Sequence, residues 1–391
     1  PPPRAHFRRK GARHFRFRTG SVAVATRGAP GAGALAGRGR CGLCGAAGRG
    51  CCRRCRLASY CDVDHQKADW VSIHKEICQL LIPIPAPLPF LLTENERKQR
   101  REQLVERQKH VLGLVQRRAQ GLVWEGRHPE AIPAALQAVR LGAEVHGSDS
   151  VQLVPAYLLL AEASTGAGCL QEASKYLSQA EWIVLSTPSC SDAVRSQVQR
   201  ALGLFCVAEG NLDQALYHLA NDIYLASSTF GLRSLEVSGG YFHMANIFSR
   251  QNKLDIANSL YTEVTAIWHS WLLSLVQAEE QILEAEPETS PFAEDREVSG
   301  DQMSEAQQEE AARVLSVVLG VREQAPKQHP GETSRVLHAL AMLWYLSRDF
   351  SKAREMGMKA LDLVKQLPHQ ESLENIGRLL KLINSQPSCT K

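Results

Sequence analysis

The sequence predicts a mostly α-helical protein in which a small cysteine-rich module precedes an array of paired helices. Two observations support this prediction. Seven of the eleven cysteines fall within residues 41–78, and beyond that segment alanine recurs at intervals of 42 residues. The chain has 391 residues, of which 44% are apolar, so it can bury the cores of two or three domains.

Charge is distributed unevenly along the chain. Residues 1–40 contain ten Lys and Arg and no Asp or Glu, whereas residues 41–391 contain 35 basic and 41 acidic residues. We predict that residues 1–40 form a disordered basic tail, although an Arg-rich, acid-free start is also typical of a mitochondrial transit peptide. No recognition helix or aromatic platform accompanies the tail, so specific nucleic-acid binding is not expected. The longest apolar run, residues 80–85, is broken by proline and too short to span a membrane.

Cysteine usage indicates a reducing compartment. A secreted disulfide framework spreads its cysteines through the fold, but here the cysteines outside residues 41–78 are few and scattered. Clustering of cysteine with histidine is typical of a metal site. We therefore expect a cytoplasmic protein and not a secreted one.

Residues 41–78 contain four pairs of potential metal ligands. Two pairs are separated by two residues, as in a tight turn, and two by three residues, as on one face of a helical turn. The eight ligands are Cys41, Cys44, Cys52, Cys55, Cys61, His65, His74 and Cys78. Eight ligands fill two tetrahedral sites with no open position, which predicts two structural Zn²⁺ ions. Zinc would supply the folding free energy that so short a segment lacks, roughly 10–16 kcal/mol per ion.

The stretch from Tyr60 to Cys78 resembles the MYND zinc-finger family. The family pattern is two C-x2-C pairs, then Tyr-Cys-x3-Cys-Gln-x3-Trp and His-x3-Cys. The resemblance implies two interleaved sites, one formed by the first and third ligand pairs and the other by the second and fourth. There are two departures from the pattern. His65 stands where Cys is usual, and three residues instead of two separate Trp70 from His74, which shifts His74 by one helical step.

The same resemblance implies a peptide-binding role. MYND fingers bind proline-rich peptides in a shallow groove near the Gln and Trp of the pattern, which are Gln66 and Trp70 in this sequence. Packing in the small core is an equally good explanation for Trp70. MYND fingers do not typically read DNA bases, so the resemblance does not imply DNA binding.

Residues 79–100 are expected to join the finger to the rest of the chain. Prolines at four alternate positions from 83 to 89 predict a semi-rigid linker. A helix should start within this range, because Thr93-Glu94-Asn95-Glu96 fits a helix-capping sequence.

An internal repeat follows the linker. Alanines lie 42 residues apart at positions 131, 173, 215 and 257 and, after a longer gap, at positions 311 and 353. Small residues recur twelve positions earlier, at Ala119, Ala161, Gly203, Ala245 and Ala341. Such positions let paired helices approach closely, so we predict an α-solenoid of about six helix pairs over residues 101–278 and 311–385. The offsets resemble tetratricopeptide repeats; the alternative is a generic helical bundle with accidental alanines.

Residues 279–310 interrupt this period. They contain twelve acidic residues and one basic residue, with two prolines and a glycine. We predict a disordered acidic insert between the helices of the fifth repeat, which is either solvated or a docking site for a basic partner. Apolar residues at helical spacing in 371–385 predict a terminal cap helix.

In a stack of helix pairs, the first helices line a concave groove. Asn246 and Arg250 are the candidate peptide contacts there. Four further residues with similar placement are Gln116, Trp124, Arg200 and His338. Each of the six has the alternative of being an ordinary exposed side chain.

The sequence contains no recognisable catalytic motif. One MYND-containing family carries a SET methyltransferase domain, but that domain needs a β-rich region and an Asn-His-x-Cys-type motif, and residues 101–385 have a helical pattern instead. Walker, dinucleotide-binding, G-x-S-x-G and H-E-x-x-H motifs are also missing. We interpret the chain as a non-catalytic interaction scaffold. Its partners would be proline-rich peptides for the finger and an unidentified protein for the repeats.

Two cellular roles fit a scaffold of this kind. Proteins that combine MYND or tetratricopeptide modules recur in cilium and flagellum assembly, often around axonemal dyneins. That resemblance implies a cytoplasmic or axonemal location and a role in sperm motility. The alternative is a transcriptional co-repressor adaptor, as other MYND proteins suggest; residues 41–391, however, contain no strong basic localisation run.

Overall fold

The computed structural model describes residues 39–82, 93–284, 303–324, 329–367 and 373–385. It contains two structural units, Pro1–Tyr176 and Leu177–Lys391, whose boundary lies inside helix α6. None of the helices in these described stretches combines the length and the apolar character that crossing a bilayer requires.

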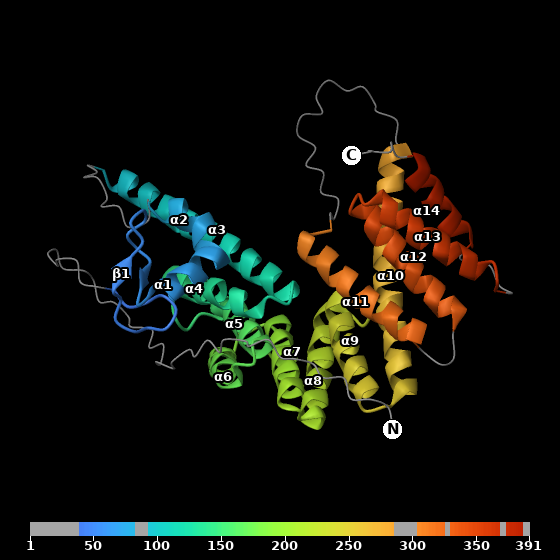
Figure 1. The fold of residues 1–391 in the computed structure, drawn as a ribbon, viewed down its shortest axis with the longest axis horizontal. Helices are drawn as coiled ribbons and strands as arrows, with labels where there is room; N and C mark the ends of the chain where they lie inside the picture. The colour runs from blue at the N-terminus through green and yellow to red at the C-terminus, as the bar shows by residue number, and fades with distance from the viewer. Residues whose placement is uncertain (1–38, 83–92, 285–302, 325–328, 368–372, 386–391) are drawn as a thin grey trace, which may run out of the picture. The chain divides into compact units, whose positions relative to one another are not determined.

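The first unit begins with the cysteine-rich finger, drawn in blue in Figure 1. Two short antiparallel strands pair Gly50 with Tyr60, and three helical segments follow without a break. These elements are β1 (Gly50–Cys51), β2 (Ser59–Tyr60), α1 (Val63–Asp69), the π-helix η1 (Trp70–His74) and α2 (Lys75–Leu81). Because α2 continues to Leu81, the predicted linker at 79–100 starts too early.

The rest of the first unit is helical. Its elements are α3 (Glu94–Trp124), α4 (His128–His146), the 3-10 helix η2 (Val151–Leu153), α5 (Val154–Gly166) and the start of α6 (Leu170–Ser186). Helix α3 begins with the predicted capping box, in which Thr93 and Glu96 each accept the backbone N–H of the other. Helix α4 packs between α3 and α5.

The second unit contains only helices in its described residues. They are the remainder of α6, α7 (Asp192–Glu209), α8 (Leu212–Phe230), α9 (Leu235–Arg250), α10 (Leu254–Glu284), α11 (Glu305–Gln324), α12 (Pro330–Leu346), α13 (Phe350–Val364) and α14 (Leu373–Ser385). From α7 to α10 each helix packs on the next, then α10 on α12, α12 on α13 and α13 on α14. Packing between successive helices is what an α-solenoid requires, so the predicted fold class is confirmed.

The periodic small residues lie at the helix contacts. All six alanines of the 42-residue period are at most 1% exposed. At Gly203 a Cβ would lie 2.9 Å from the Leu219 side chain, so α7 and α8 approach too closely for any larger residue. The position seven residues after each alanine is also buried, and in α8 it is occupied by Asp222 instead of an apolar side chain.

Several predicted segments fall wholly or partly outside the described residues. They are the basic tail except residues 39–40, the linker at 83–92 and the acidic insert at 285–302. The limits of the insert need correction, since α10 extends to Glu284 and α11 begins at Glu305. The predicted cap helix corresponds to α14, which buries Ile376, Leu379, Leu380 and Ile383.

Candidate metal centre

The eight predicted ligands form two separate groups. One contains Cys41, Cys44, Cys61 and His65, and the other contains Cys52, Cys55, His74 and Cys78. Within each group the potential ligand atoms lie within 4.8 Å of one another. This is the interleaved arrangement that the family resemblance implied.

The distances within the group that contains Cys52 fit a tetrahedral zinc ion, and in the other group Cys61 Sγ and His65 Nδ1 lie closer together, at 3.0 Å. With Zn–S near 2.3 Å and Zn–N near 2.0–2.1 Å, tetrahedral edges are about 3.8 Å between sulfurs and about 3.6 Å between sulfur and nitrogen. The Sγ atoms of Cys52 and Cys78 are 3.8 Å apart, and Cys55 Sγ is 3.6 Å from His74 Nε2. In the other group, Cys41 Sγ is 3.5 Å from His65 Nδ1. Two closed Cys3His sites of this composition confirm the prediction of two structural zinc ions.

Backbone amides prepare the first cysteine of each C-x2-C pair to bind metal. Burial would raise the pKa of Cys41, but hydrogen bonds from the amides of Cys44 and Leu43 lower it to about 6. Burial would also raise the pKa of Cys52, but hydrogen bonds from the Cys55 amide, the His74 side chain and the Arg54 amide lower it to about 6. Since the thiolate is the metal ligand, these turns favour the binding form of the side chain.

An N-cap fixes the histidine of the first site. The carboxylate of Asp62 accepts the His65 backbone N–H at 2.7 Å and caps α1. This hydrogen bond also lowers the pKa of Asp62. His65 is therefore held one helical turn after Cys61, with its Nδ1 atom 3.0 Å from Cys61 Sγ.

A π-helical turn places the histidine of the second site. The Lys75 amide donates to the carbonyl of Trp70, five residues earlier, so η1 accommodates one residue more than an α-helical turn would. This turn coincides with the additional residue between Trp70 and His74. His74 is 2% exposed and reaches Cys55, so the extra residue does not remove it from the site.

A buried carboxylate orients His74. Asp69 Oδ2 lies 3.6 Å from His74 Nδ1, and the hydroxyl of Tyr60 donates to Asp69 Oδ2 at 2.6 Å. Metal-bound histidines commonly direct their second nitrogen at a carboxylate, which fixes the ring orientation. Burial raises the pKa of Asp69, whereas Tyr60, His74 and Arg140 lower it.

Comparison with known families agrees with this geometry. Residues 41–78 match the MYND finger family. The match covers the finger only, so it identifies this module and not the whole chain.

Among solved structures, the chain is similar to the crystal structure of BtubC (BKLC) from P. vanneervenii, at 14% identity. The match covers 72% of this chain and 95% of that chain, with a TM-score of 0.30. A score this low does not establish a common fold.

The two candidate peptide contacts of the MYND finger lie one turn apart. Gln66 is exposed on α1, and Trp70 is half-buried at the start of η1, with its amide donating to the Gln66 carbonyl. The Trp70 ring is also 5.8 Å from the His74 ring. Trp70 therefore packs against a ligand of the second zinc site and is only partly exposed.

The two candidate peptide contacts in the helical array line a shared hollow. This hollow, of about 480 Å³, lies between α9, α10 and α11. Its lining residues are Phe242, His243, Asn246, Ser249, Arg250, Tyr261, Arg313, Val317 and Val321. The Tyr261 hydroxyl donates to Asn246 Oδ1 at 2.8 Å, so this hydrogen bond uses the side-chain oxygen of Asn246 and not its amide N–H groups. Burial lowers the pKa of His243 to about 3, and Arg200 and Arg313 add to this effect.

Two other predicted groove residues are engaged inside the second unit. Arg200 forms an ion pair with the buried Asp222, with Nε 2.7 Å from Oδ2, and also donates to the Glu236 carbonyl. His338 is 2% exposed, and its Nδ1 lies 3.0 Å from His269 Nε2. Neither residue is the free surface side chain that the groove prediction required.

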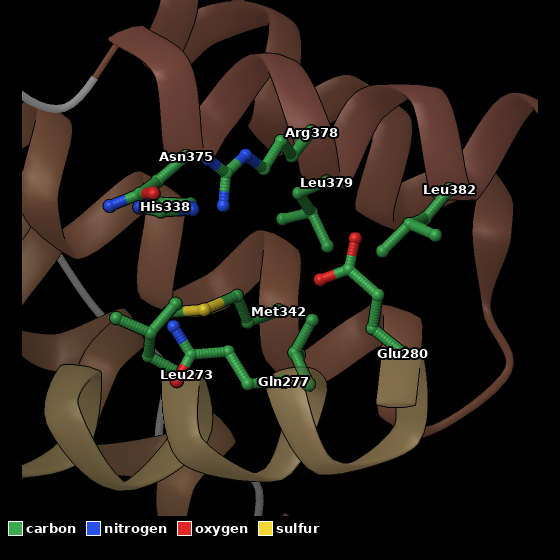
Figure 2. Close-up of a pocket in the computed structure, with 10 residues that line it drawn as sticks. Leu273, Gln277, Glu280, His338, Met342, Asn375, Arg378, Leu379 and Leu382 are labelled. Atoms are coloured by element: carbon green, nitrogen blue, oxygen red, sulfur yellow. The ribbon is translucent and has the colours of Figure 1, made fainter. Parts of the chain in front are cut away.

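Figure 2 shows the small cavity beside His338, with Asn375 and Arg378 above it and Leu273 and Gln277 below. Its volume of about 20 Å³ has room for one water molecule but not for a peptide side chain. His338 Nε2 has no hydrogen-bond partner among the described residues. We therefore do not interpret this cavity as a binding site.

Sequence reasoning missed three residues around the finger. They are Asp69, which orients His74, Ser72, which contacts α4, and Arg140, which reaches the finger from α4. Asp69 and Ser72 lie within the finger sequence, but an acidic and a hydroxyl side chain there look like ordinary surface residues. Arg140 is distant in sequence, and nothing local connects it with the ligands.

Proposed function

We propose that this protein is a non-catalytic interaction scaffold with two peptide-binding surfaces, one on the MYND finger and one on the helical array. The observation that carries the proposal is the pair of closed Cys3His sites. Four protein ligands leave no position at which a zinc-bound water could react, so the metal would serve folding and not catalysis. What remains available on the finger is its outer surface.

The proposed finger surface is built around Gln66 and Trp70. An exposed amide beside a half-buried indole suits a proline-rich peptide, because proline rings pack on aromatic faces and the amide can bond the peptide backbone. Val63 and Val71, which are 61% and 57% exposed, offer further apolar surface on the same helices.

Fluorescence anisotropy with labelled proline-rich peptides tests this surface. We expect Gln66→Ala and Trp70→Ala to weaken binding at least about tenfold, as the loss of a central contact does. Lys67→Ala is the matched control, because Lys67 is exposed on the same helix. Zinc content must remain at two ions per chain in every variant, which separates lost contacts from a misfolded finger. Equal affinity for a scrambled, proline-free peptide would exclude proline recognition.

The proposed surface on the helical array is the hollow that contains Asn246 and Arg250. Arg250 and Arg313 both line this hollow and are exposed, and Arg313 also interacts with the carboxyl of Glu310 on its own helix. Together with the Asn246 amide, these two cations would favour an acidic peptide segment.

A labelled hexaglutamate peptide tests the second surface. Arg250→Gln and Arg313→Gln should each weaken binding several-fold and reduce its dependence on salt. Lys253→Gln is the control, because this nearby cation packs over the Phe248 ring and does not line the hollow. Binding that is insensitive to both arginine substitutions would refute the assignment.

We further propose, from the resemblance stated above, that the partners are axonemal proteins related to dynein assembly. Affinity purification from ciliated or testicular tissue, compared with nuclear extract, distinguishes the two cellular roles. Recovery of axonemal proteins would support the flagellar role. Recovery of chromatin factors alone would favour the co-repressor adaptor.

A further inference from the structure

The MYND finger does not stand apart from the helical array but docks on its first helices. The Ser72 hydroxyl donates to the carbonyl oxygen of Glu130 in α4 at 2.6 Å and accepts the Ala134 amide at 3.1 Å. On the other side, the Arg118 side chain in α3 donates to the Ser72 carbonyl at 3.3 Å. It also lies 3.7 Å from Glu76. The finger and these helices belong to one structural unit.

A proline of α4 lies next to this contact. Pro133 lies within the helix, where it cannot donate a hydrogen bond and its ring disturbs the turn before it. The Ser72 hydroxyl bonds to backbone groups on both sides of Pro133, at Glu130 and Ala134. The finger thus forms hydrogen bonds to α4 in the turn that contains Pro133.

One cation from α4 extends further into the finger. Arg140 is half-buried, and its Nη1 atom comes within 3.1 Å of where a Cβ on Gly42 would lie, next to the zinc ligand Cys41. Burial lowers the pKa of Arg140, and the negative charges of Asp69 and Cys41 are the leading opposing influences. Asp69 belongs to the second site through His74, and Cys41 belongs to the first.

The zinc-loaded sites are negatively charged, which is why a cation at Arg140 matters. Three thiolates and one neutral imidazole around Zn²⁺ leave each site with one unit of excess negative charge. Asp69 adds another buried negative group beside them. The arginines on the segment between β1 and β2 are directed to solvent, since Arg53, Arg54 and Arg56 are all exposed. Arg140, by contrast, is half-buried beside Gly42 of the first site and interacts electrostatically with Asp69, the carboxylate that contacts His74.

We propose that Arg140 is an outer-sphere residue of both zinc sites, so that the finger holds its two ions tightly only while it is docked on α4. The array would then be part of the zinc-binding module and not merely attached to it. Removing an outer-sphere partner of a metal ligand typically costs roughly 10- to 100-fold in metal affinity.

Zinc release from the full-length protein tests this proposal. The zinc-loaded chain is mixed with the colorimetric chelator pyridylazoresorcinol, and the release of each of the two ions is followed in time. We expect Arg140→Met, which keeps the apolar stem but removes the charge, to accelerate release by roughly 10- to 100-fold. Arg140→Lys should lie between this variant and the wild type, because it retains the charge.

Two matched variants separate charge from packing. Arg117→Met removes an exposed arginine from α3 and should leave release unchanged. Arg118→Met weakens the docking contacts with Ser72 and Glu76 without removing a charge next to Asp69, so it should have a smaller effect than Arg140→Met. Wild-type release from R140M, or equal rates for R140M and R140K, would overturn the proposal. If R140M does not fold, R140Q and R140K give the same contrast between a lost and a retained charge.

Discussion

The hydroxyl of Ser72 in the MYND finger and the carbonyl of Glu130 in α4 form a 2.6 Å hydrogen bond. The same hydroxyl accepts the amide of Ala134, so one small side chain serves two backbone groups of a helix that Pro133 weakens. The Ser72 hydroxyl bridges a carbonyl and an amide four residues apart in α4, in the turn that contains Pro133. The finger therefore contributes to the stability of the array as well as to its own.

Replacing Ser72 with alanine tests that contribution. We expect Ser72→Ala to destabilise the first unit by about 1–3 kcal/mol, because the two hydrogen bonds that join the finger to α4 are lost. Faster hydrogen exchange at the Ala134 amide and its neighbours in α4 would report the effect locally. The control is Ser274→Ala, since Ser274 is exposed and bonds only within its own helix. Unchanged exchange in α4 would show that the contact is dispensable.

Zinc stoichiometry should follow the two ligand groups. Cys78→Ser removes one thiolate from the second group and should reduce the zinc content from two ions to one, because the groups share no residue. Cys51→Ser is the control, as Cys51 is exposed and lies outside both groups although it adjoins Cys52. Elemental analysis of the purified proteins gives the answer. Loss of an ion from C51S would mean that the ligand assignment is wrong.

The pair of Arg200 and Asp222 should be strongly coupled. Asp222 is fully buried, accepts the Ser196 hydroxyl at 2.5 Å and has Arg200 Nε at 2.7 Å. Asp222→Ala should destabilise the second unit by about 3–5 kcal/mol, since it leaves Arg200 without its counter-charge.

A double-mutant cycle with Arg200→Met isolates the interaction. The double variant should be no less stable than D222A alone, because neither partner then remains unpaired. Asp213→Ala, an exposed acid on the same helix, provides the reference for a surface change. Strictly additive losses in the cycle would contradict the coupling. Chemical denaturation followed by circular dichroism supplies the free energies.

Buried histidines should make the second unit sensitive to acid. Burial lowers the pKa of His338 to about 3 and that of His269 to about 4, while an unfolded histidine titrates near 6.5. Above pH ~6.5 both states are neutral and the effect is absent. As pH falls below that value, the unfolded state takes up the proton first, so stability declines until the folded pKa is reached.

Comparison with His338→Gln isolates one of these groups. The fall in unfolding free energy between pH 6.5 and 4 should become less steep by up to about 1.4 kcal/mol per pH unit. His110→Gln, at an exposed position on α3, serves as the control. The zinc ligands also protonate in this range, but they are identical in all three proteins, so the difference between proteins is the measurement. Parallel slopes for wild type and H338Q would exclude a role for His338.

Local patterns made much of this architecture predictable. Ala131 and Ala353 could be placed at helix contacts because a small side chain recurring at a fixed interval has a packing cause, and both are fully buried. The spacing within each cysteine pair reflects a single turn, so it can also be recognised from the sequence alone. The two zinc sites and the helical array follow from such short-range rules.

The remaining features depend on residues that meet only in the folded chain. Asp222 occupies a position where other repeats have alanine or valine, and Arg200 and Ser196 on a neighbouring helix make its burial tolerable. Ser72 and Glu130 are 58 positions apart, and nothing in the local sequence around either residue indicates that they meet. Arg140 likewise lies far from Cys41 in sequence. Pairings of this kind require the tertiary structure.

The alternation of ligand pairs also constrains the order of events on the ribosome. Neither site is formed by a contiguous segment. The first site is completed at His65, when two ligands of the second have already emerged, and the second is completed only at Cys78, after all four ligands of the first. Arg140 and the α4 carbonyl that receives Ser72 are synthesised later still. At ~5–20 residues per second, the nascent finger spends on the order of several seconds loaded but undocked. Zinc supply and the emergence of α4 would then act in succession as checkpoints in the maturation of this protein.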